Sequence, residues 1–381
     1  MTSFSDLGLA APLLAAVAGA NYAEPTPIQA QAIPPALTGR DVLGIAQTGT
    51  GKTAAFALPI LTRLQSGPRA LPTAPRALIL APTRELAAQI GESFRMLGRR
   101  LGTRVAVVFG GVPKGRQARA LAAGVDVVVA TPGRLLDLMG DRAIRLDRVE
   151  VLVLDEADHM LDLGFILPIR RIVAHVPTAR QTMFFSATMP KEIATLADGL
   201  LRDPARVAVA PVATTVDKIE QRVIFVEQAG KRRVLARLLG GVAPGRTLVF
   251  TRTKHGADRV VKHLAEDGIA AEAIHGNKSQ PQRERALAAF RSGHARVLVA
   301  TDIAARGIDV TGIEHVINFE LPNVPESYVH RIGRTARAGA AGAAISLCDG
   351  AERAFLRDIE KLIRTKLPAM PMPEENLKRA A

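Results

Sequence analysis

The sequence predicts an α/β protein of two domains, each built on a parallel sheet that helices cover. Short runs rich in valine, leucine and isoleucine alternate with helical patterns along the chain. This alternation is typical of strands that are buried on both faces of a parallel sheet. The alternation begins again near Val223. The chain has 381 residues, which is more than one typical hydrophobic core supports. Two domains are therefore expected.

The expected strands form two groups on either side of a segment without clear periodicity. The first group comprises residues 42–45, 77–80, 105–108, 125–129, 151–154 and 183–185, and the second comprises 223–226, 247–250, 297–300 and 316–319. The segment 208–215 between them contains Pro211, which favours a linker with a hinge. We expect an N-terminal domain over 1–209, a linker over 210–217, a C-terminal domain over 218–367 and a short loose tail over 368–381.

A glycine-containing turn follows the first expected strand and has the pattern of a phosphate-binding loop at a helix N-terminus. Gly49 and Gly51 lack a Cβ, which lets such a loop wrap a polyphosphate closely. Lys52 can reach the β and γ oxygens, and Thr53 can offer its hydroxyl to Mg²⁺. The alternative is an ordinary glycine-rich turn with a solvated lysine. Ala46 stands where such loops usually begin with glycine. The expected nucleotide contacts are Ala46, Gln47, Thr48, Gly49, Thr50, Gly51, Lys52 and Thr53.

An acidic motif follows the apolar run 151–154. Asp155 is expected at the carboxyl edge of a parallel strand, where open α/β sheets bind ligands, and it would hold Mg²⁺ together with Thr53. Glu156 is placed to orient or deprotonate an attacking water. We therefore expect catalytic roles for Lys52, Asp155 and Glu156. A solvated acidic turn is the alternative, and the upstream phosphate loop disfavours it.

An arginine-rich segment lies near the end of the second expected domain. Arg334 and Arg337 are three residues apart and share a face if the segment is helical, so they could reach a γ-phosphate as catalytic residues. The alternative is a basic surface helix, because exposed arginine pairs are much commoner than arginine fingers.

Composition limits the class of protein and its partners. Lys and Arg total 50 against 36 Asp and Glu, and the net charge of +14 favours a polyanionic partner. Cys348 is the only cysteine, which excludes an intramolecular disulfide. Residues 9–20 are apolar but follow Asp6 rather than a basic region, so we expect a helix and not a signal peptide. No apolar run is long enough to span a bilayer, and the cytoplasm is the expected location.

Further motifs stand in a fixed order around these sites. They are residues 22–29, 82–87, 110–111, 131–134, 186–188, 250–253, 280–283, 301–302, 305–309 and 330–337. With the phosphate loop and the sequence Asp155-Glu156-Ala157-Asp158, this series resembles that of the DEAD-box RNA helicases of superfamily 2, over nearly the whole chain. The resemblance implies two tandem RecA-like domains that use ATP and Mg²⁺.

The resemblance also implies roles for single residues. It implies adenine recognition by Tyr22 and Gln29, ribose contact by Asp309, and arginine fingers at Arg334 and Arg337. Residues implied to couple hydrolysis to strand separation are Asp158, Ser186 and Thr188. Those implied to touch the RNA backbone are Pro82, Arg84, Gly111, Thr131, Arg134, Arg252 and Thr301.

Local alternatives and departures accompany the resemblance. Without it, residues 131–134 and 186–188 would be interpreted as helix caps. Asn21 and Ala336 stand where the family usually has glycine. At Asn21 the departure concerns the local turn. At Ala336 we expect the added methyl group to be tolerated.

The resulting hypothesis is a monomeric ATP-dependent RNA helicase, similar to the bacterial RhlE-like group, that unwinds short duplexes with little sequence preference. The scarcity of aromatic residues, 4% with no tryptophan, disfavours base stacking as the main way of binding RNA. We expect any RNA specificity to come from protein partners in ribosome assembly or RNA decay, and no contact with membranes. Two alternatives are an ATP-controlled RNA clamp that serves as a scaffold, and a DNA-dependent translocase of the wider superfamily.

Overall fold

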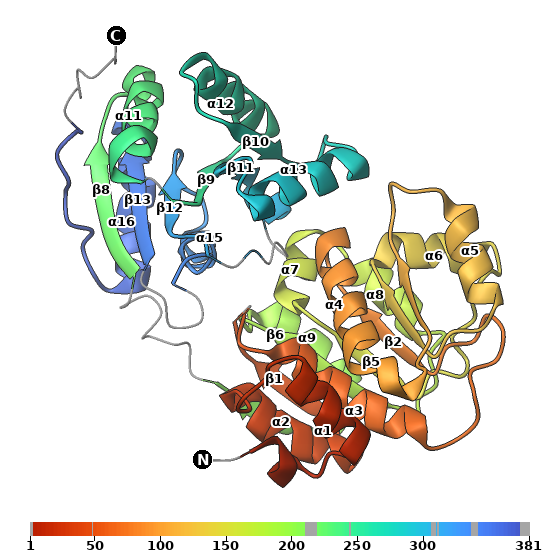
Figure 1. Ribbon diagram of the computed structural model, residues 1–381. Coiled ribbons are helices and arrows are strands. Elements are labelled where there is room, and N and C mark those ends of the chain that lie inside the picture. The colour runs from red at the N-terminus through yellow and green to blue at the C-terminus, as the bar shows by residue number, and fades with distance from the viewer. Residues whose placement is uncertain are drawn as a thin grey trace. The chain divides into compact units, whose positions relative to one another are not determined.

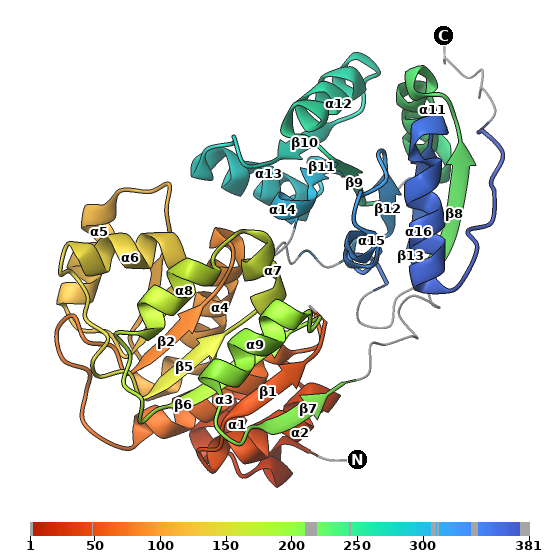
Figure 2. The same ribbon diagram turned by 180° about the vertical axis from the view of Figure 1, so that it is seen from behind.

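The chain divides into two compact units, Met1–Pro211 and Val212–Ala381. The computed structural model (Figures 1 and 2) describes residues 3–47, 49–209, 219–243, 245–305, 310, 312–336 and 342–373. The expected linker at 210–217 lies outside the described residues. Each unit is a parallel α/β sheet with helices on both faces, which confirms the predicted fold class.

The first unit contains seven parallel strands in the order β3-β4-β2-β5-β6-β1-β7. Its strands are β1 (Val42–Ile45), β2 (Ala77–Leu80), β3 (Val105–Val108), β4 (Val127–Ala130), β5 (Val151–Leu154), β6 (Gln181–Ser186) and β7 (Ala205–Ala208). Its helices are η1 (Phe4–Leu7), α1 (Ala11–Gly19), α2 (Pro27–Leu37), α3 (Lys52–Gln65), α4 (Arg84–Leu97), η2 (Arg99–Leu101), α5 (Lys114–Ala122), α6 (Pro132–Gly140), α7 (Ala157–Asp162), α8 (Ile166–Val173) and α9 (Lys191–Leu200).

Successive strand residues in this unit point to opposite faces and build two cores. On β5, Val151 and Val153 pack with α1 to α4, whereas Leu152 and Leu154 pack with α6 to α9. Figures 1 and 2 show these two helical layers on opposite sides of the sheet. Strands buried on both faces explain why β1, β2 and β5 are nearly continuous apolar runs. Their carboxyl ends, where the site residues lie, are therefore held on a rigid sheet.

The second unit contains six parallel strands in the order β10-β11-β9-β12-β13-β8. They are β8 (Ile219–Phe225), β9 (Thr247–Thr251), β10 (Ala271–Ile274), β11 (Val297–Thr301), β12 (His315–Asn318) and β13 (Gly342–Cys348). The helices are η3 (Gln228–Gly230), α11 (Lys231–Arg237), the π-helical η4 (Leu238–Val242), α12 (Lys254–Glu266), α13 (Gln280–Ser292), α14 (Asp302–Ala305), α15 (Pro325–Ile332), η6 (Gly350–Glu352) and α16 (Arg353–Ile363). Helices α11 and α12 cover one face, and α13 to α16 cover the other.

Three strands were not predicted from the sequence, namely β7, β10 and β13. They are rich in alanine, glycine or charge, which have weak intrinsic preference for strands, so pairing with neighbouring strands stabilises them. Ala208, expected in the linker segment, is the last residue of β7.

The expectation of a loose tail is wrong for its first residues. The N–H of Val223 on β8 donates to Pro368, and the N–H of Met370 donates back to Val223, at 3.0 and 2.8 Å. Arg237 also donates to the carbonyl of Pro373 at 3.2 Å. Residues 368–373 thus lie along the edge of the second sheet, because β8 offers unpaired backbone groups there.

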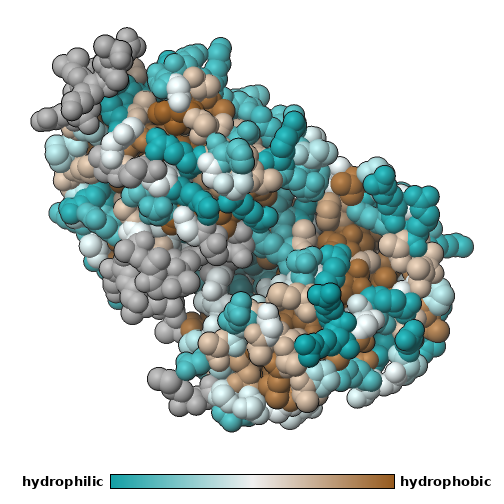
Figure 3. Space-filling model, in the orientation of Figure 1, coloured by the Kyte–Doolittle hydropathy of each residue, from teal (hydrophilic) through white to brown (hydrophobic). Residues whose placement is uncertain are grey.

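The described helices include none that is both long and apolar enough to cross a membrane. On the face drawn in Figure 3, hydrophilic and apolar residues are interspersed.

Candidate functional site

The phosphate loop connects β1 to α3 in the first unit, as predicted. Its two glycines have left-handed backbones, with φ of 87° at Gly49 and 93° at Gly51. A Cβ at Gly51 would lie 2.5 Å from Nε2 of Gln29, so glycine is required for both conformation and space. Ala46 is buried, and its N–H donates to Ser186 of β6 at 3.0 Å. This bond anchors the start of the loop. Of the loop residues, Thr48 lies outside the described part of the chain.

Lys52 is the first residue of α3, and its side chain is only 5% exposed. Its Nζ lies 3.7 Å from Oδ1 of Asp155 and makes no hydrogen bond to any described residue. A buried ammonium normally has hydrogen-bond partners, so this group indicates a place for an anionic ligand. The start of a helix favours the same charge.

Asp155 follows β5 and carries the acidic half of the site. Burial raises the pKa of Asp155 to about 6, although the Lys52 ammonium lowers it. A further cation would favour the charged carboxylate in this buried position. A carboxylate together with the half-buried hydroxyl residue Thr53, the second residue of α3, supplies the oxygen donors that Mg²⁺ prefers. The residues present therefore fit a magnesium ion bound beside a polyphosphate.

Glu156 adopts a left-handed backbone with φ of 53° and ψ of 54°, which is uncommon for a residue other than glycine. Its N–H donates to Oδ1 of Asp155 at 3.0 Å, which supports this conformation. Its carboxylate lies 3.4 Å from Nδ1 of His159 on α7. Such strain often occurs at functional sites, and here it sets Glu156 apart from the helix that follows.

The three predicted coupling residues are in direct contact. Thr188 donates to Oδ2 of Asp158 through both its N–H and its hydroxyl, at 2.9 Å each. The Ser186 hydroxyl accepts from the N–H of Asp158 at 3.2 Å and donates to the carbonyl of Thr188 at 2.8 Å. The end of β6 is therefore tied to the start of α7. The coupling role of this bond set remains a prediction.

The predicted adenine-binding segment packs against the phosphate loop. Gln29 accepts from the N–H of Thr26 at 3.0 Å and donates to the carbonyl of Gly51 at 3.1 Å. Among the described residues its amide makes no other bond, which leaves one N–H and one lone pair for a ligand. Tyr22 is half-buried beside Phe4, with ring centroids 6.4 Å apart. Asn21 has φ of 58°, so asparagine here adopts the left-handed turn that glycine would provide.

The predicted RNA contacts of the first unit come from the carboxyl ends of three neighbouring strands, β3, β4 and β2. A Cβ at Gly111 would overlap the guanidinium of Arg84, so glycine lets the loop after β3 approach the start of α4. Arg134 donates to the carbonyl of Val112 and to Gln117, at 3.0 and 3.2 Å. Pro82 and Thr131, which follow β2 and β4, lie at the same carboxyl edge of the sheet, and both are buried.

The second unit places Arg252 after β9 and Thr301 at the end of β11, also at the carboxyl edge of a sheet. Arg252 donates its N–H to Glu320 at 2.7 Å and its Nη1 to Asn323 at 3.2 Å. Thr301 is half-buried. The predicted ribose contact Asp309 lies outside the described residues.

The expectation that Arg334 lies on a helix is not met. Helix α15 ends at Ile332, and Arg334 lies in the following turn, with its Nε donating to His330 at 3.3 Å. Arg337 lies outside the described residues. Ala336 has φ of 53°, a conformation that costs an L-residue about 1–2 kcal/mol, so its methyl group is not as neutral as expected.

Several contacts between polar residues around these sites were not predicted. His159 lies three residues after Glu156, and helical spacing could have drawn attention to it. Arg331 forms two bonds to Asp302, at 2.5 and 2.7 Å. No local sequence signal predicts the contact of Arg331 with Asp302 or that of Arg134 with Gln117, because the partners are distant along the chain.

The sequence of the chain is similar to those of known helicases. Residues 26–196 match the DEAD/DEAH box helicase family, and residues 230–339 match the helicase conserved C-terminal domain. The chain is 44% identical over 373 residues to the DEAD-box ATP-dependent RNA helicase CshA of Bacillus cereus, covering 98% of this chain and 70% of that one. It is also 44% identical to CshA of Bacillus subtilis, covering 97% and 74%.

Two solved structures are also similar to this chain in sequence and fold. S. cerevisiae Dbp5 bound to RNA and ADP BeF3 is 32% identical, with a TM-score of 0.87 and coverage of 98% of this chain and 96% of that one. A DEAD box protein from the hyperthermophile Methanococcus jannaschii is 36% identical, with a TM-score of 0.55 and coverage of 97% and 99%. The identity and coverage of these relatives show that the chain belongs to the DEAD-box ATP-dependent RNA helicase family, as its motifs predicted.

Proposed function

We propose that the first unit binds ATP with Mg²⁺ between the phosphate loop and Asp155, and that hydrolysis there drives local unwinding of short RNA duplexes. The observation that carries this proposal is the buried Lys52 ammonium, which among the described residues has one ion pair, to Asp155 at 3.7 Å, and no hydrogen bond. A triphosphate would supply the acceptors that this ammonium needs.

Each residue of the site has a distinct task in this proposal. Lys52 binds the β and γ oxygens, and the backbone N–H groups at the start of α3 orient them. Asp155 and Thr53 would hold Mg²⁺, which neutralises charge on the phosphate oxygens when bound. Glu156 orients the attacking water and accepts its proton. Gln29 and Tyr22 would bind the adenine.

The second unit contributes cations and RNA contacts in the same proposal. Arg334 and Arg337 would stabilise negative charge on the transferred phosphoryl group, and Asp309 would bind the ribose. The RNA backbone would contact the residues at the carboxyl ends of β2, β3 and β4 in the first unit, together with Arg252 and Thr301. Backbone contacts carry no sequence information, so binding should depend on salt and on the 2′-hydroxyl rather than on base identity. A monomer in the cytoplasm, with specificity from ribosome-assembly or RNA-decay partners, remains our prediction.

The experiment is steady-state ATPase of the full chain with single-stranded RNA, with DNA of the same sequence, and with neither, at one moderate salt concentration. We expect RNA and not DNA to stimulate turnover. Glu156→Gln should lower stimulated turnover by about 10²- to 10³-fold, because it removes the proton acceptor while keeping the size of the side chain.

Other outcomes separate the alternatives. Equal stimulation by DNA would favour a translocase, and turnover that survives Glu156→Gln would contradict the role of Glu156. Unwinding of a short RNA duplex is measured in parallel. RNA held tightly with ATP, but without strand separation, would favour the clamp.

A further inference from the structure

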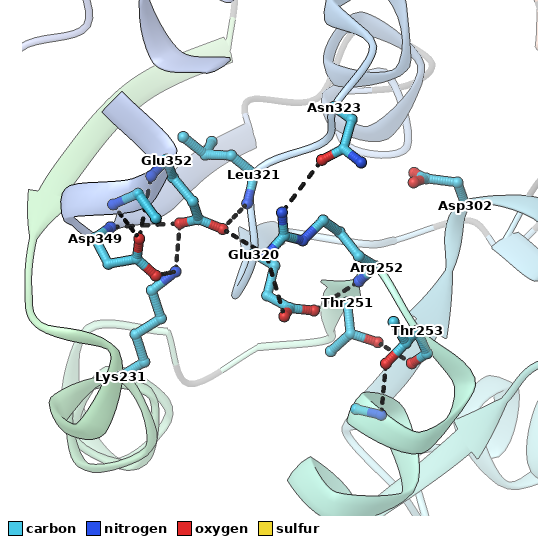
Figure 4. Close-up of polar contacts among 12 residues, drawn as sticks. Lys231, Thr251, Arg252, Thr253, Asp302, Glu320, Leu321, Asn323, Asp349 and Glu352 are labelled. Carbon is cyan, nitrogen blue, oxygen red and sulfur yellow. Dashed lines mark hydrogen bonds and ion pairs between the residues drawn. The ribbon is translucent and has the colours of Figure 1, made fainter. Parts of the chain in front are cut away.

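A buried ionic cluster in the second unit surrounds Lys231, the first residue of α11. Its side chain is only 2% exposed and lies between two carboxylates, those of Asp349 and Glu352 (Figure 4). Nζ is 3.1 Å from Oδ2 of Asp349 and forms a short ion pair with Oε2 of Glu352. Although burial raises the pKa of Asp349, hydrogen bonding and charge from Lys231 outweigh it and lower the pKa.

The second oxygen of Glu352 faces away from Lys231. Oε1 accepts from the N–H of Leu321 at 3.1 Å and lies 3.8 Å from Nη2 of Arg252. Glu352 therefore stands between a lysine that it binds closely and an arginine that it approaches at longer range. Figure 4 shows this chain of contacts from Lys231 through Glu352 to Arg252.

Arg252 itself is held on several sides. Its Nη2 is 3.7 Å from Oε1 of Glu320, and its guanidinium lies 5.8 Å from the ring centroid of Phe355 on α16. Its side chain is still one-third exposed, at 33%. The guanidinium is thus oriented without being buried, as a group that binds a phosphate should be.

The charges in this cluster are unequal. Three carboxylates, those of Glu320, Asp349 and Glu352, face two cations, Lys231 and Arg252. If Lys231 were removed, Arg252 would be the one cation left in this cluster to balance the three carboxylates. Attraction between opposite charges is strong where water is scarce, so Glu352 would then compete with RNA phosphate for the guanidinium.

We propose that Lys231 is a positioning residue for RNA binding: it neutralises the buried carboxylates of Asp349 and Glu352 and so keeps the Arg252 guanidinium available to an RNA phosphate. This inference rests on the proposed contact between Arg252 and RNA. Lys231 itself does not touch the RNA.

The test measures the affinity of the full chain for a fluorescent single-stranded RNA by anisotropy, with a saturating non-hydrolysable ATP analogue, over a range of salt. Lys231→Met should weaken binding about tenfold and reduce the salt slope by about 0.7, which corresponds to one lost phosphate contact. Arg252→Ala should do the same, and the double variant should lose no more than Arg252→Ala alone.

A second pair of variants distinguishes competition from simple structural support. Lys231→Met with Glu352→Gln removes both partners of the ion pair and keeps their shapes, so RNA affinity should return to within about twofold of the wild type. Arg232→Met is the matched control. Arg232 is the neighbouring cation, it is exposed, and it pairs with Glu266 at 2.7 Å. The control should leave the affinity and slope unchanged.

Each result decides a different claim. If Arg252→Ala binds RNA as the wild type does, the proposed RNA contact of Arg252 fails. If Arg252→Ala weakens binding but Lys231→Met does not, the inference about Lys231 fails. Additive losses in the Lys231→Met and Arg252→Ala double variant, or no recovery with Glu352→Gln, would show that Lys231 only supports the fold. Affinity for the ATP analogue is measured for every variant, since the first unit should be unaffected.

Discussion

Two buried lysines, one in each unit, differ in what surrounds them. Lys52 begins α3 in the first unit, and Lys231 begins α11 in the second. Lys52 has a single carboxylate at 3.7 Å and no hydrogen bond to any described residue, whereas Lys231 contacts two carboxylates closely. Both lie at the start of a helix, where a positive charge is not favoured by the helix dipole.

The contrast shows how the same residue type serves two purposes. A buried cation whose partners are all protein groups stabilises the fold, because its desolvation is compensated within the chain. A buried cation with few protein partners is compensated only when a ligand binds. The first case fits Lys231 and the second fits Lys52, so their variants should fail in different ways.

The largest expected effect concerns Lys52. Lys52→Met should lower kcat/KM for ATP by about 10³-fold, because it removes the charge that binds the phosphates. The free energy of unfolding should fall by no more than about 1 kcal/mol, since Asp155, with a pKa of about 6, can take up a proton once the lysine is gone. RNA-stimulated ATPase and urea unfolding measure the two quantities. Lys114→Met, which removes an exposed lysine paired with Asp141, is the control. A normal kcat/KM in Lys52→Met would show that Lys52 does not bind the phosphates.

Lys231 should show the opposite pattern. Lys231→Met should lower the free energy of unfolding of the second unit by about 3 kcal/mol, because two buried carboxylates lose their shared cation. Urea unfolding followed by circular dichroism measures this loss. Arg232→Met, at an exposed ion pair, should cost less than about 1 kcal/mol. Equal losses in the two variants would mean that the buried cluster contributes no more than a surface pair.

Gly51 tests whether the loop that presents Lys52 is built for close contact. Gly51→Ala should cost about 2 kcal/mol and weaken nucleotide binding, because alanine meets both an unfavourable φ and the side chain of Gln29. Gly102→Ala is the matched control, since its φ is 66° and nothing lies within 4 Å of the added Cβ. It should cost only about 1 kcal/mol and leave nucleotide affinity unchanged. Fluorescence titration measures the nucleotide affinity of both variants, and equal affinities would show that the loop does not need glycine at position 51.

The mildest of these four variants is expected to be Thr188→Val. Thr188→Val removes its hydroxyl bond to Asp158 but keeps its N–H bond and its shape, so stability should fall by about 1 kcal/mol. ATPase should stay within about threefold, while unwinding per ATP should fall severalfold if this bond couples the two activities. Thr195→Val, which removes an exposed hydroxyl bond to Lys191, serves as the control. Equal unwinding in both variants would reject the coupling role.

The sequence was most informative where chemistry is local. Buried strands such as β1 and β5 are continuous apolar runs, and the phosphate loop combines glycines that need positive φ with a lysine at a helix start. In both cases the physical constraints act on adjacent residues, so the strands and the loop can be predicted from the sequence. The strand β13 was missed because its alanines and glycine have weak strand preference, and pairing on both sides stabilises it.

Other features depend on contacts that no spacing reveals. Lys231 and Glu352 are 121 residues apart, and Arg134 reaches Gln117 seventeen positions away. Arg334 does not lie on a helix as expected, because α15 ends at Ile332 and helix ends are hard to locate from a single sequence. The ion pairs that distinguish the two buried lysines thus required the structure.

Hydrogen–deuterium exchange of the peptides that cover residues 46–65, with and without a saturating ATP analogue and Mg²⁺, is the measurement that decides whether Lys52 is reserved for a nucleotide. It reports nucleotide binding within the first unit, whatever happens to the second. We expect strong protection in the wild type and in Lys231→Met, and none in Lys52→Met. Protection that persists in Lys52→Met would contradict the claim that this buried ammonium is reserved for the nucleotide.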